Sequence, residues 1–249
     1  MKTKGISQET LKLIACVTML IDHIGAALVA PTDAIYHASV ELYTAMAWVN
    51  LVMRCIGRIA FPIFCFLLVE GVYHTRNPKK YVQRLAIGMV LSEIPFDLAF
   101  FSDGISWAHQ SVMVTLLLGC LMVLGMKQTK GFWKLLWIVP FYFAAEWLHT
   151  DYAGDGILLI AMFALVKGTK HEKWLRVAGM FLLYWDFSFV CRYYNLDVYI
   201  PMDRLPLLSA IPILCYNGQK LTYSKKVQWA FYLFYPVHIA VICLIGMIF

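Results

Sequence analysis

The stretch LKLIACVTMLIDHIGAALVA, residues 11–30, decides the fold class of this chain. Lys12, Asp22 and His23 are its only charged or imidazole side chains. Since an α-helix rises 1.5 Å per residue, a run of roughly twenty residues matches the ~30 Å hydrocarbon core of a bilayer. The stretch therefore predicts a membrane-spanning helix. It is too long, and too many similar runs follow it, for a cleaved signal peptide, so we expect a retained anchor.

Similar apolar runs occupy most of the remaining sequence. Hydrophobic residues make up 61% of the 249 positions and charged residues only 14%, well below the fraction usual in soluble domains. This composition excludes a water-soluble fold. We expect one all-α domain over residues 1–249, a polytopic integral membrane helical bundle of about nine transmembrane helices. The further expected spans are residues 54–74, 81–101, 111–126, 133–149, 154–167, 172–191, 204–217 and 227–249.

Three segments allow more than one arrangement. Residues 38–53 mix Glu41 and Asn50 with apolar and aromatic side chains. They suit either an amphipathic helix in the outer interface or the start of one long, tilted span. The expected spans at residues 154–167 and 204–217 are short, so either one could be a half-helix or could lie slanted against its neighbours.

Basic residues are concentrated in alternate loops. Cytoplasmic loops of membrane proteins keep an excess of Lys and Arg, which sets the orientation of the chain. The basic set comprises Lys2, Lys4, Arg76, Lys79, Lys80, Lys127, Lys130, Lys134, Lys167, Lys170, Lys173, Arg176, Lys220, Lys225 and Lys226, whereas the opposite loops offer only Arg192 and Arg204. The pattern predicts a cytoplasmic N-terminus and an outer C-terminus. The net charge of +6 then reflects topology and not a nucleic-acid partner.

Asp22 and His23 are the first functional candidates. An ionisable side chain at mid-bilayer costs several kcal/mol unless it is paired or hydrated, so such a residue is a candidate by default. Lys12 marks the inner end of this span, and His23 lies ~16 Å further along the helix. Consecutive residues diverge by about 100°, so we expect one of the pair to line a site and the other to bind a neighbouring helix.

Arg54 and Arg58 form a second candidate group. Their spacing of four residues places both guanidinium groups on one helix face. Such a patch could hold phosphates or carboxylates. It could equally pair with Glu70, Glu93 or Asp97 to neutralise buried charge.

Glu93 and Asp97 also share a helix face, on either side of Pro95. Proline removes a backbone N–H and predicts a kink at this point. A kinked helix that carries two carboxylates is typical of a cavity wall. A structural pair of salt bridges is an equally good interpretation.

Two further histidines lie in apolar surroundings. Glu146 and His149 have the E-x-x-H spacing of di-iron bundles, but those sites need two such motifs and more carboxylates than this chain offers. We therefore expect no metal. His238 follows an aromatic run over residues 231–236, where a lone histidine is usually a hydrogen-bonded packing residue. Seven cysteines lie in or beside apolar runs without paired spacing and do not suggest disulfides.

Five stretches together resemble the TraX family, named for the conjugal transfer protein that acetylates pilin. They are LKLIACVTMLIDHIGA, MRCIGRIAFPIFCFLLVEGVYHTRN, KKYVQRLAIGMVLSEIPFDLAF, WLHTDYAGDGILL and FYLFYPVHI. Lys12 and His23 also resemble the basic-x10-His pattern of the acyltransferase-3 family, which is similar to heparan glucosaminide acetyltransferase within a broader transmembrane acyltransferase group. Lysine stands where many of those relatives have arginine, which removes a bidentate grip on phosphate there.

The resemblance implies an acyltransferase in the bacterial cytoplasmic (inner) membrane. Acetyl-CoA would be the cytoplasmic acyl donor, and the acceptor would be an amine or hydroxyl at the outer side, on a peptide N-terminus or a glycan. The donor phosphates need positive charge. The candidates are Lys12, Lys79, Lys80 and Arg84 at the inner face, with Arg54 and Arg58 deeper.

His23 is the implied general base, since a neutral imidazole can accept a proton as the acceptor attacks. An acetyl-histidine intermediate is the covalent alternative. Asp22, Glu70 or Glu146 could orient the imidazole or stabilise its cation. An arginine or His238 could stabilise the oxyanion.

Two rival functions remain open at this stage. Buried carboxylates, histidines and proline-kinked helices also build proton relays, so a small ion-coupled or proton-coupled transporter is the main alternative. Transporters often contain inverted repeats, and none is apparent here. A non-catalytic membrane partner in a secretion or pilus assembly is the third possibility, and it would need no histidine at depth.

Overall fold

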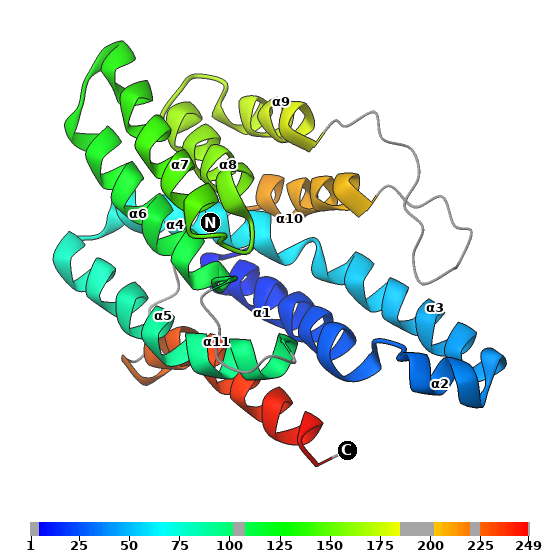
Figure 1. The fold of residues 1–249 in the computed structure, drawn as a ribbon. Helices are drawn as coiled ribbons and strands as arrows, with labels where there is room; N and C mark the ends of the chain where they lie inside the picture. The colour runs from blue at the N-terminus through cyan, green and yellow to red at the C-terminus, as the bar shows by residue number, and fades with distance from the viewer. Residues whose placement is uncertain (1–4, 102–107, 185–201, 220–224, 249) are drawn as a thin grey trace.

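The computed structural model describes residues 5–101, 108–184, 202–219 and 225–248, and these ranges form helices and no strand (Figure 1). The α-helices are α1 (Gln8–Ile24), α2 (Asp33–Ala38), α3 (Val40–Gly57), α4 (Ala60–His74), α5 (Pro78–Phe100), α6 (Val112–Gln128), α7 (Ile138–Trp147), α8 (Ala153–Val166), α9 (Glu172–Tyr184), α10 (Ala210–Leu214) and α11 (Lys225–Gly246). A π-helix, η1 (Gly25–Val29), follows α1, and 3-10 helices η2 (Gly131–Trp137) and η3 (Met202–Ser209) precede α7 and α10.

Three helical stretches are long and apolar enough to cross a membrane. They are Gln8–Val29, Val40–His74 and Val227–Gly246. Residues on the outward faces of other helices, such as Trp133, Trp147 and Trp174, are also largely exposed. Exposed apolar side chains in such number suit contact with lipid. The all-helical prediction is confirmed for the described residues, while the count of about nine spans and the orientation of the chain stay predictions. The last part of the expected span at 172–191 lies outside the described residues.

α3 and α4 follow one another almost without interruption. The stretch Val40–His74 runs for 35 residues, and only a two-residue turn at Arg58 and Ile59 separates the two helices. Two arrangements were expected for residues 38–53, an interfacial helix or the start of one long span. The structure agrees with the second, because these residues continue into α4 within one candidate span. A helix of this length exceeds the thickness of the hydrocarbon core, so it must tilt or project from the bilayer.

The core of the bundle surrounds α4. This helix packs against α1, α6 and α8, and its residues Ile63, Phe66 and Val69 are almost completely buried. α11 lies beside α5 on the other flank of α1, as Figure 1 shows in red and blue-green. The first and last helices of the chain are therefore neighbours in space, which places α11 beside the far end of α1.

Gly57 at the end of α3 allows α3 to approach α1 closely. A Cβ atom added at position 57 would overlap the side chain of Asp22, including the Cβ atom of Asp22. Since the near part of Asp22 cannot swing away, only glycine permits this crossing. The close approach brings the polar residues of both helices to one level of the bundle.

Candidate functional site

The imidazole rings of His23 and His238 form a hydrogen-bonded pair. Nδ1 of His23, on α1, lies 2.7 Å from Nε2 of His238, on α11. The two rings are nearly parallel, with an interplanar angle of 2°. On its other side, Nδ1 of His238 lies 2.7 Å from the carbonyl oxygen of Phe234, one turn earlier in the same helix. Two histidines that are far apart in sequence are thus joined in one chain of hydrogen bonds.

This chain fixes which nitrogen carries each proton when both rings are neutral. A carbonyl oxygen only accepts hydrogen bonds, so Nδ1–H of His238 donates to Phe234 and its Nε2 becomes an acceptor. Nδ1–H of His23 must then donate to His238. The remaining nitrogen, Nε2 of His23, keeps its lone pair. An imidazole held in this tautomer has the form that a general base requires.

α3 holds the end of α1 on both sides of His23. Nη1 of Arg54 lies 2.6 Å from Oδ2 of Asp22, and both side chains are mostly buried. One turn earlier on α3, the buried Asn50 donates from Nδ2 to the carbonyl oxygen of Gly25, at 2.5 Å. Gly25 begins the π-helix η1, and a π-helical turn leaves local carbonyls in need of other partners. The two contacts fix the backbone from which His23 projects.

A polar cluster surrounds this level of the bundle, formed by Asp22, Arg54, Arg58, Asp151 and Tyr152. Arg58 interacts electrostatically with Asp22 and Asp151 and hydrogen-bonds the side chain of Tyr152. Nε of Arg58 and Oδ1 of Asp22 are buried without a hydrogen-bond partner among the described residues. Such atoms normally find a partner in water or a ligand. The cluster therefore has capacity for another polar group.

Asp151 belongs to the turn between α7 and α8. Its side chain is accessible to solvent, yet protein surrounds it on enough sides that desolvation raises its pKa to about 6. The Asp22 carboxylate adds to this rise. The positive charges of Arg58 and Arg54, and His109, act in the opposite direction. Asp151 can therefore change its charge near neutral pH.

Glu93 and Ser111 add a further polar contact near α11. Oγ of Ser111 donates to the Glu93 carboxylate at 2.6 Å, and the backbone N–H of Ser111 donates to its other oxygen at 3.3 Å. Ser111 precedes α6, and Glu93 lies on α5. Within the described residues, the hydrogen bonds of the Glu93 carboxylate are therefore with a serine and not with a basic side chain.

A half-open cavity of about 310 Å³ leads from the beginning of α1 toward the histidine pair. Gln8 and Lys12 line it at one end, and Met19 lines it one helical turn before His23. Tyr235 also lines the cavity, and its ring lies edge-on to His23 with the centroids 5.9 Å apart. Neither imidazole lines the cavity itself, and the ring of Tyr235 connects the cavity lining to the histidine pair.

Three basic side chains line the opposite end of this cavity. They are Lys12 of α1, His74 of α4 and Arg84 of α5. Lys12 lies over the ring of Phe231, at 5.2 Å, and Arg84 lies over the ring of Tyr232, at 5.6 Å. The cavity thus combines basic side chains at the end farther from the histidine pair with an apolar interior. An anionic head group joined to a narrow, weakly polar chain fits this distribution of charge.

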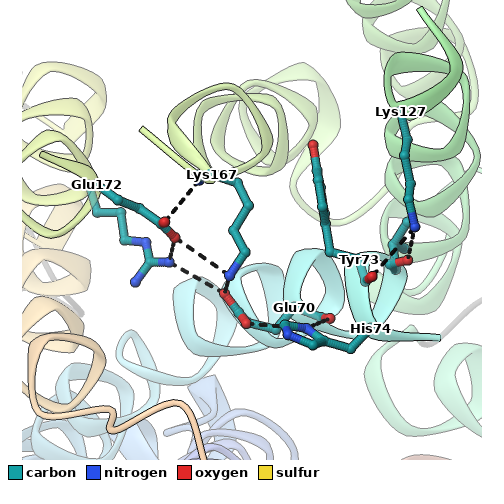
Figure 2. A network of polar contacts seen from close by, with 9 residues as sticks. Glu70, Tyr73, His74, Lys127, Lys167 and Glu172 are labelled. Atoms are coloured by element: carbon teal, nitrogen blue, oxygen red, sulfur yellow. Dashed lines mark hydrogen bonds and ion pairs between the residues drawn. The ribbon is translucent and has the colours of Figure 1, made fainter. Parts of the chain in front are cut away.

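A buried ion-pair network lies next to His74, as Figure 2 shows. The Glu70 carboxylate, only 3% exposed, lies 2.5 Å from Nζ of Lys167 and 3.3 Å from Nη2 of Arg176. Glu172 contacts both basic residues as well. These residues join the end of α4 to α8 and α9.

The sequence comparison decides the family. The model of the family described as TraX protein matches residues 7–246, nearly the whole chain. The chain belongs to the TraX family. A curated TraX-like relative, the probable fimbrial assembly protein FimC, serogroup H1, of Dichelobacter nodosus, is 29% identical over 244 residues, which cover 94% of this chain and 93% of that protein. An uncharacterized protein of Rickettsia prowazekii (strain Madrid E) is 27% identical over 172 residues, 67% of this chain and 57% of that protein. No solved structure matches.

The structure of this TraX protein brings several predicted residues together. His23 contacts His238, while its neighbour Asp22 binds Arg54, so the two consecutive side chains do bind different helices. Arg54 pairs with Asp22 and not with the carboxylates of α4 or α5 that the sequence suggested. Lys12 and Arg84 line one cavity.

Two other predicted residues bind groups other than His23. The Glu70 carboxylate pairs with Lys167 and Arg176. Glu146 accepts a hydrogen bond from the backbone N–H of Gly154, at 3.0 Å, and so stabilises the turn before α8.

The predicted donor-binding residues lie in different places. Lys79 and Lys80 are exposed at the start of α5 and do not line the cavity. Arg54 and Arg58 do not line it either. They belong to the polar cluster, so a donor phosphate in the cavity would meet Lys12 and Arg84 instead.

Sequence reasoning missed three residues of the site. His74 looked like an ordinary loop residue, but it ends α4 and lines the cavity. Asp151 lies between the expected spans 133–149 and 154–167, and no sequence pattern singles it out. Tyr235 was read as part of an aromatic run, although it precedes His238 by three residues and so shares its helix face. The three-residue spacing was the feature of the sequence that could have indicated a shared site for Tyr235 and His238.

Proposed function

We propose that this TraX protein is a membrane acetyltransferase that uses acetyl-CoA as its acyl donor. What supports the proposal most is a cavity that carries basic side chains at one end and is connected by Tyr235 to the histidine pair. The family assignment favours the same chemistry. The curated relative of Dichelobacter nodosus is named for fimbrial assembly, which is consistent with a protein that modifies pilin.

The proposed topology has about nine spans, with the N-terminus in the cytoplasm and the C-terminus outside the cytoplasmic membrane. Lys12, His74 and Arg84 lie at the end of the bundle where α1 begins and α4 ends. The basic loops predicted to be cytoplasmic adjoin the same end, for example at Lys167 beside Glu70. The charged end of the cavity then opens to the compartment that supplies acetyl-CoA.

In the proposed complex, the phosphates of acetyl-CoA bind near Lys12, His74 and Arg84. The pantetheine chain follows the apolar interior past Met19, and the thioester comes to rest beside His23. Nε2 of His23 removes the proton of the acceptor as that group attacks the thioester carbonyl carbon. Acetylation of His23 itself is the covalent variant. His238 fixes the tautomer of His23 in either case.

The acceptor is proposed to be an amine or hydroxyl that enters from the side of the polar cluster. Asp151 is accessible there and can bind an ammonium group when it is ionised. A pilin-like peptide N-terminus fits these properties and the name of the fimbrial relative, with a glycan hydroxyl as the other class.

The decisive experiment uses the purified protein in lipid nanodiscs. Radiolabelled acetyl-CoA is added together with a peptide amine or a sugar acceptor, and binding and transfer are measured separately. We expect saturable acetyl-CoA binding and acceptor-dependent transfer of label. Absence of any acetyl-CoA binding would favour a transporter, and binding without transfer to any acceptor would count against the enzyme assignment.

Arg84→Ala is expected to raise the KM for acetyl-CoA about tenfold and to leave kcat nearly unchanged. One charge-assisted hydrogen bond to phosphate is worth about 1.5–3 kcal/mol, and part of it is lost to solvent screening at the cavity mouth. Lys80→Ala is the matched control, because Lys80 is exposed on the same helix but does not line the cavity. Equal KM values for the two variants would exclude this cavity as the donor site.

An amine acceptor is expected to bind about tenfold more tightly at pH 7 than at pH 5. The pKa of Asp151 is raised to about 6, so its carboxylate is mostly protonated at pH 5 and mostly ionised at pH 7. Only the ionised form attracts an ammonium group. Affinity is measured by titration without acetyl-CoA, so that no reaction occurs.

Asp151→Asn should bind weakly at both pH values and show a flat profile. His109 also interacts electrostatically with Asp151. His109→Gln therefore serves as the control and should keep the rise in affinity. A rise that persists in Asp151→Asn would show that another group controls acceptor binding.

A further inference from the structure

The hydroxyl group of Tyr235 is a buried polar group without a hydrogen bond. Tyr235 is only 5% exposed, and its Oη has no hydrogen-bond partner among the described residues. Ser111 is close enough to influence this hydroxyl, but no contact between the two side chains meets the distance and angle requirements of a hydrogen bond. A buried hydroxyl that is left unpaired destabilises the protein, because it has lost its hydrogen bonds to water. A ligand that supplies an acceptor atom would remove this destabilisation.

The position of Tyr235 connects the cavity to the histidine pair. Its side chain lines the cavity. Its ring also lies edge-on to both imidazoles, with centroid distances of 5.9 Å to His23 and 5.5 Å to His238. Tyr235 and His238 are three residues apart on α11, so one helix face presents both side chains. A group in the cavity can therefore meet the phenol, whose ring contacts both imidazoles.

We propose that Tyr235 donates its hydroxyl hydrogen bond to the carbonyl oxygen of the bound thioester and stabilises the negative charge that develops there. This inference rests on the proposed acetyltransferase function. The acceptor nitrogen or oxygen forms a bond to the carbonyl carbon, and the electron pair of the C=O π bond moves to the oxygen, which Tyr235 stabilises. Nε2 of His23 takes the proton of the acceptor.

Collapse of the intermediate completes the transfer. The C=O bond forms again, the C–S bond breaks, and the electron pair of that bond leaves with the sulfur of coenzyme A. The proton on His23 then passes to this thiolate, which restores the neutral imidazole. Tyr235 keeps its proton throughout, so the role is electrostatic and requires no change in its ionisation.

Two arginines and His238, among the described residues, are already engaged with other groups. Arg54 is paired with Asp22, and Arg84 lies over Tyr232 at the charged end of the cavity. His238 donates from Nδ1 to Phe234 and accepts from His23 with its other nitrogen. Tyr235 lines the cavity, and its hydroxyl has no hydrogen-bond partner within the part of the chain that the structure describes.

The test is Tyr235→Phe in nanodiscs, because it removes one oxygen atom and keeps the ring that packs in the core. We expect kcat for acetyl transfer to fall about 10²-fold to 10³-fold, as for loss of an oxyanion-hole donor. The dissociation constant for acetyl-CoA should change by less than about threefold, since a ground-state carbonyl gains little from this bond. Tyr73→Phe is the control, because Tyr73 lies on α4 outside the cavity lining and its hydroxyl makes only a 3.4 Å contact with a backbone oxygen.

The outcomes separate this proposal from the function on which it rests. Wild-type protein that neither binds nor uses acetyl-CoA would refute the acetyltransferase assignment. Wild-type transfer together with full kcat in Tyr235→Phe would overturn only the role of Tyr235. A large rise in the dissociation constant with unchanged kcat would also overturn it, because Tyr235 would then serve donor binding alone.

Discussion

Replacement of His23 by glutamine is expected to lower kcat for acetyl transfer about 10³-fold, within the range observed for loss of a general base. Glutamine can still donate a hydrogen bond to Nε2 of His238, but it offers no basic nitrogen to the acceptor. The affinity for acetyl-CoA should stay close to that of the wild type, because His23 does not line the cavity. Single-turnover transfer and equilibrium binding, measured on the same preparation, give the two quantities.

His37→Gln is the matched control for this substitution. His37 lies on the exposed helix α2, and the change should leave both quantities unaltered. His238→Gln should produce a smaller loss than His23→Gln, because it disturbs the tautomer and orientation of His23 without removing the base. Full activity of His23→Gln would leave the proposed chemistry without its central residue.

Replacement of Glu70 by glutamine is expected to lower the free energy of unfolding by about 3–5 kcal/mol, the cost of breaking a buried ion pair on one side. The change leaves the positive charges of Lys167 and Arg176 without their buried carboxylate partner. Lys167 is 18% exposed, so water can relieve part of the penalty and the lower end of the range is the better estimate for that contact. Thermal unfolding in a mild detergent would report the loss.

Glu172→Gln provides the comparison within the same network. Glu172 contacts the same two basic residues but is 21% exposed, so its loss should cost less than that of Glu70. The double variant Glu70→Gln with Arg176→Gln should recover part of the loss, since it no longer buries an unpaired charge. A change of less than about 1 kcal/mol in Glu70→Gln would mean that water already solvates this network.

The sequence predicted the helices well because each one appears as a run of apolar residues. Each expected span coincides with a helical stretch wherever the structure describes it. Hydropathy could not distinguish an α-helix from the 3-10 turns of η2 and η3 or from the π-helix η1. Those local forms depend on contacts such as that of Asn50 with the carbonyl of Gly25, which join different helices.

The site could be predicted residue by residue but not pair by pair. The cost of placing charge in a membrane singles out Asp22 and Arg54 individually. Their pairing depends on the close crossing that Gly57 permits, and spacing along the chain does not reveal it. For the same reason His238 looked like a packing residue, since its partner His23 lies 215 positions away.

The order in which the chain is made has a consequence for this histidine pair. Contacts between α1 and α3 close loops of only 25 and 32 residues, so that helical hairpin can form as soon as α3 has been synthesised. The partner of His23 is translated 215 residues later, which corresponds to roughly 10–40 s on a bacterial ribosome. During that interval α1 and α3 can hold His23 in place, but its tautomer is not yet fixed. Only the insertion of α11, which brings His238, completes the hydrogen-bonded histidine pair.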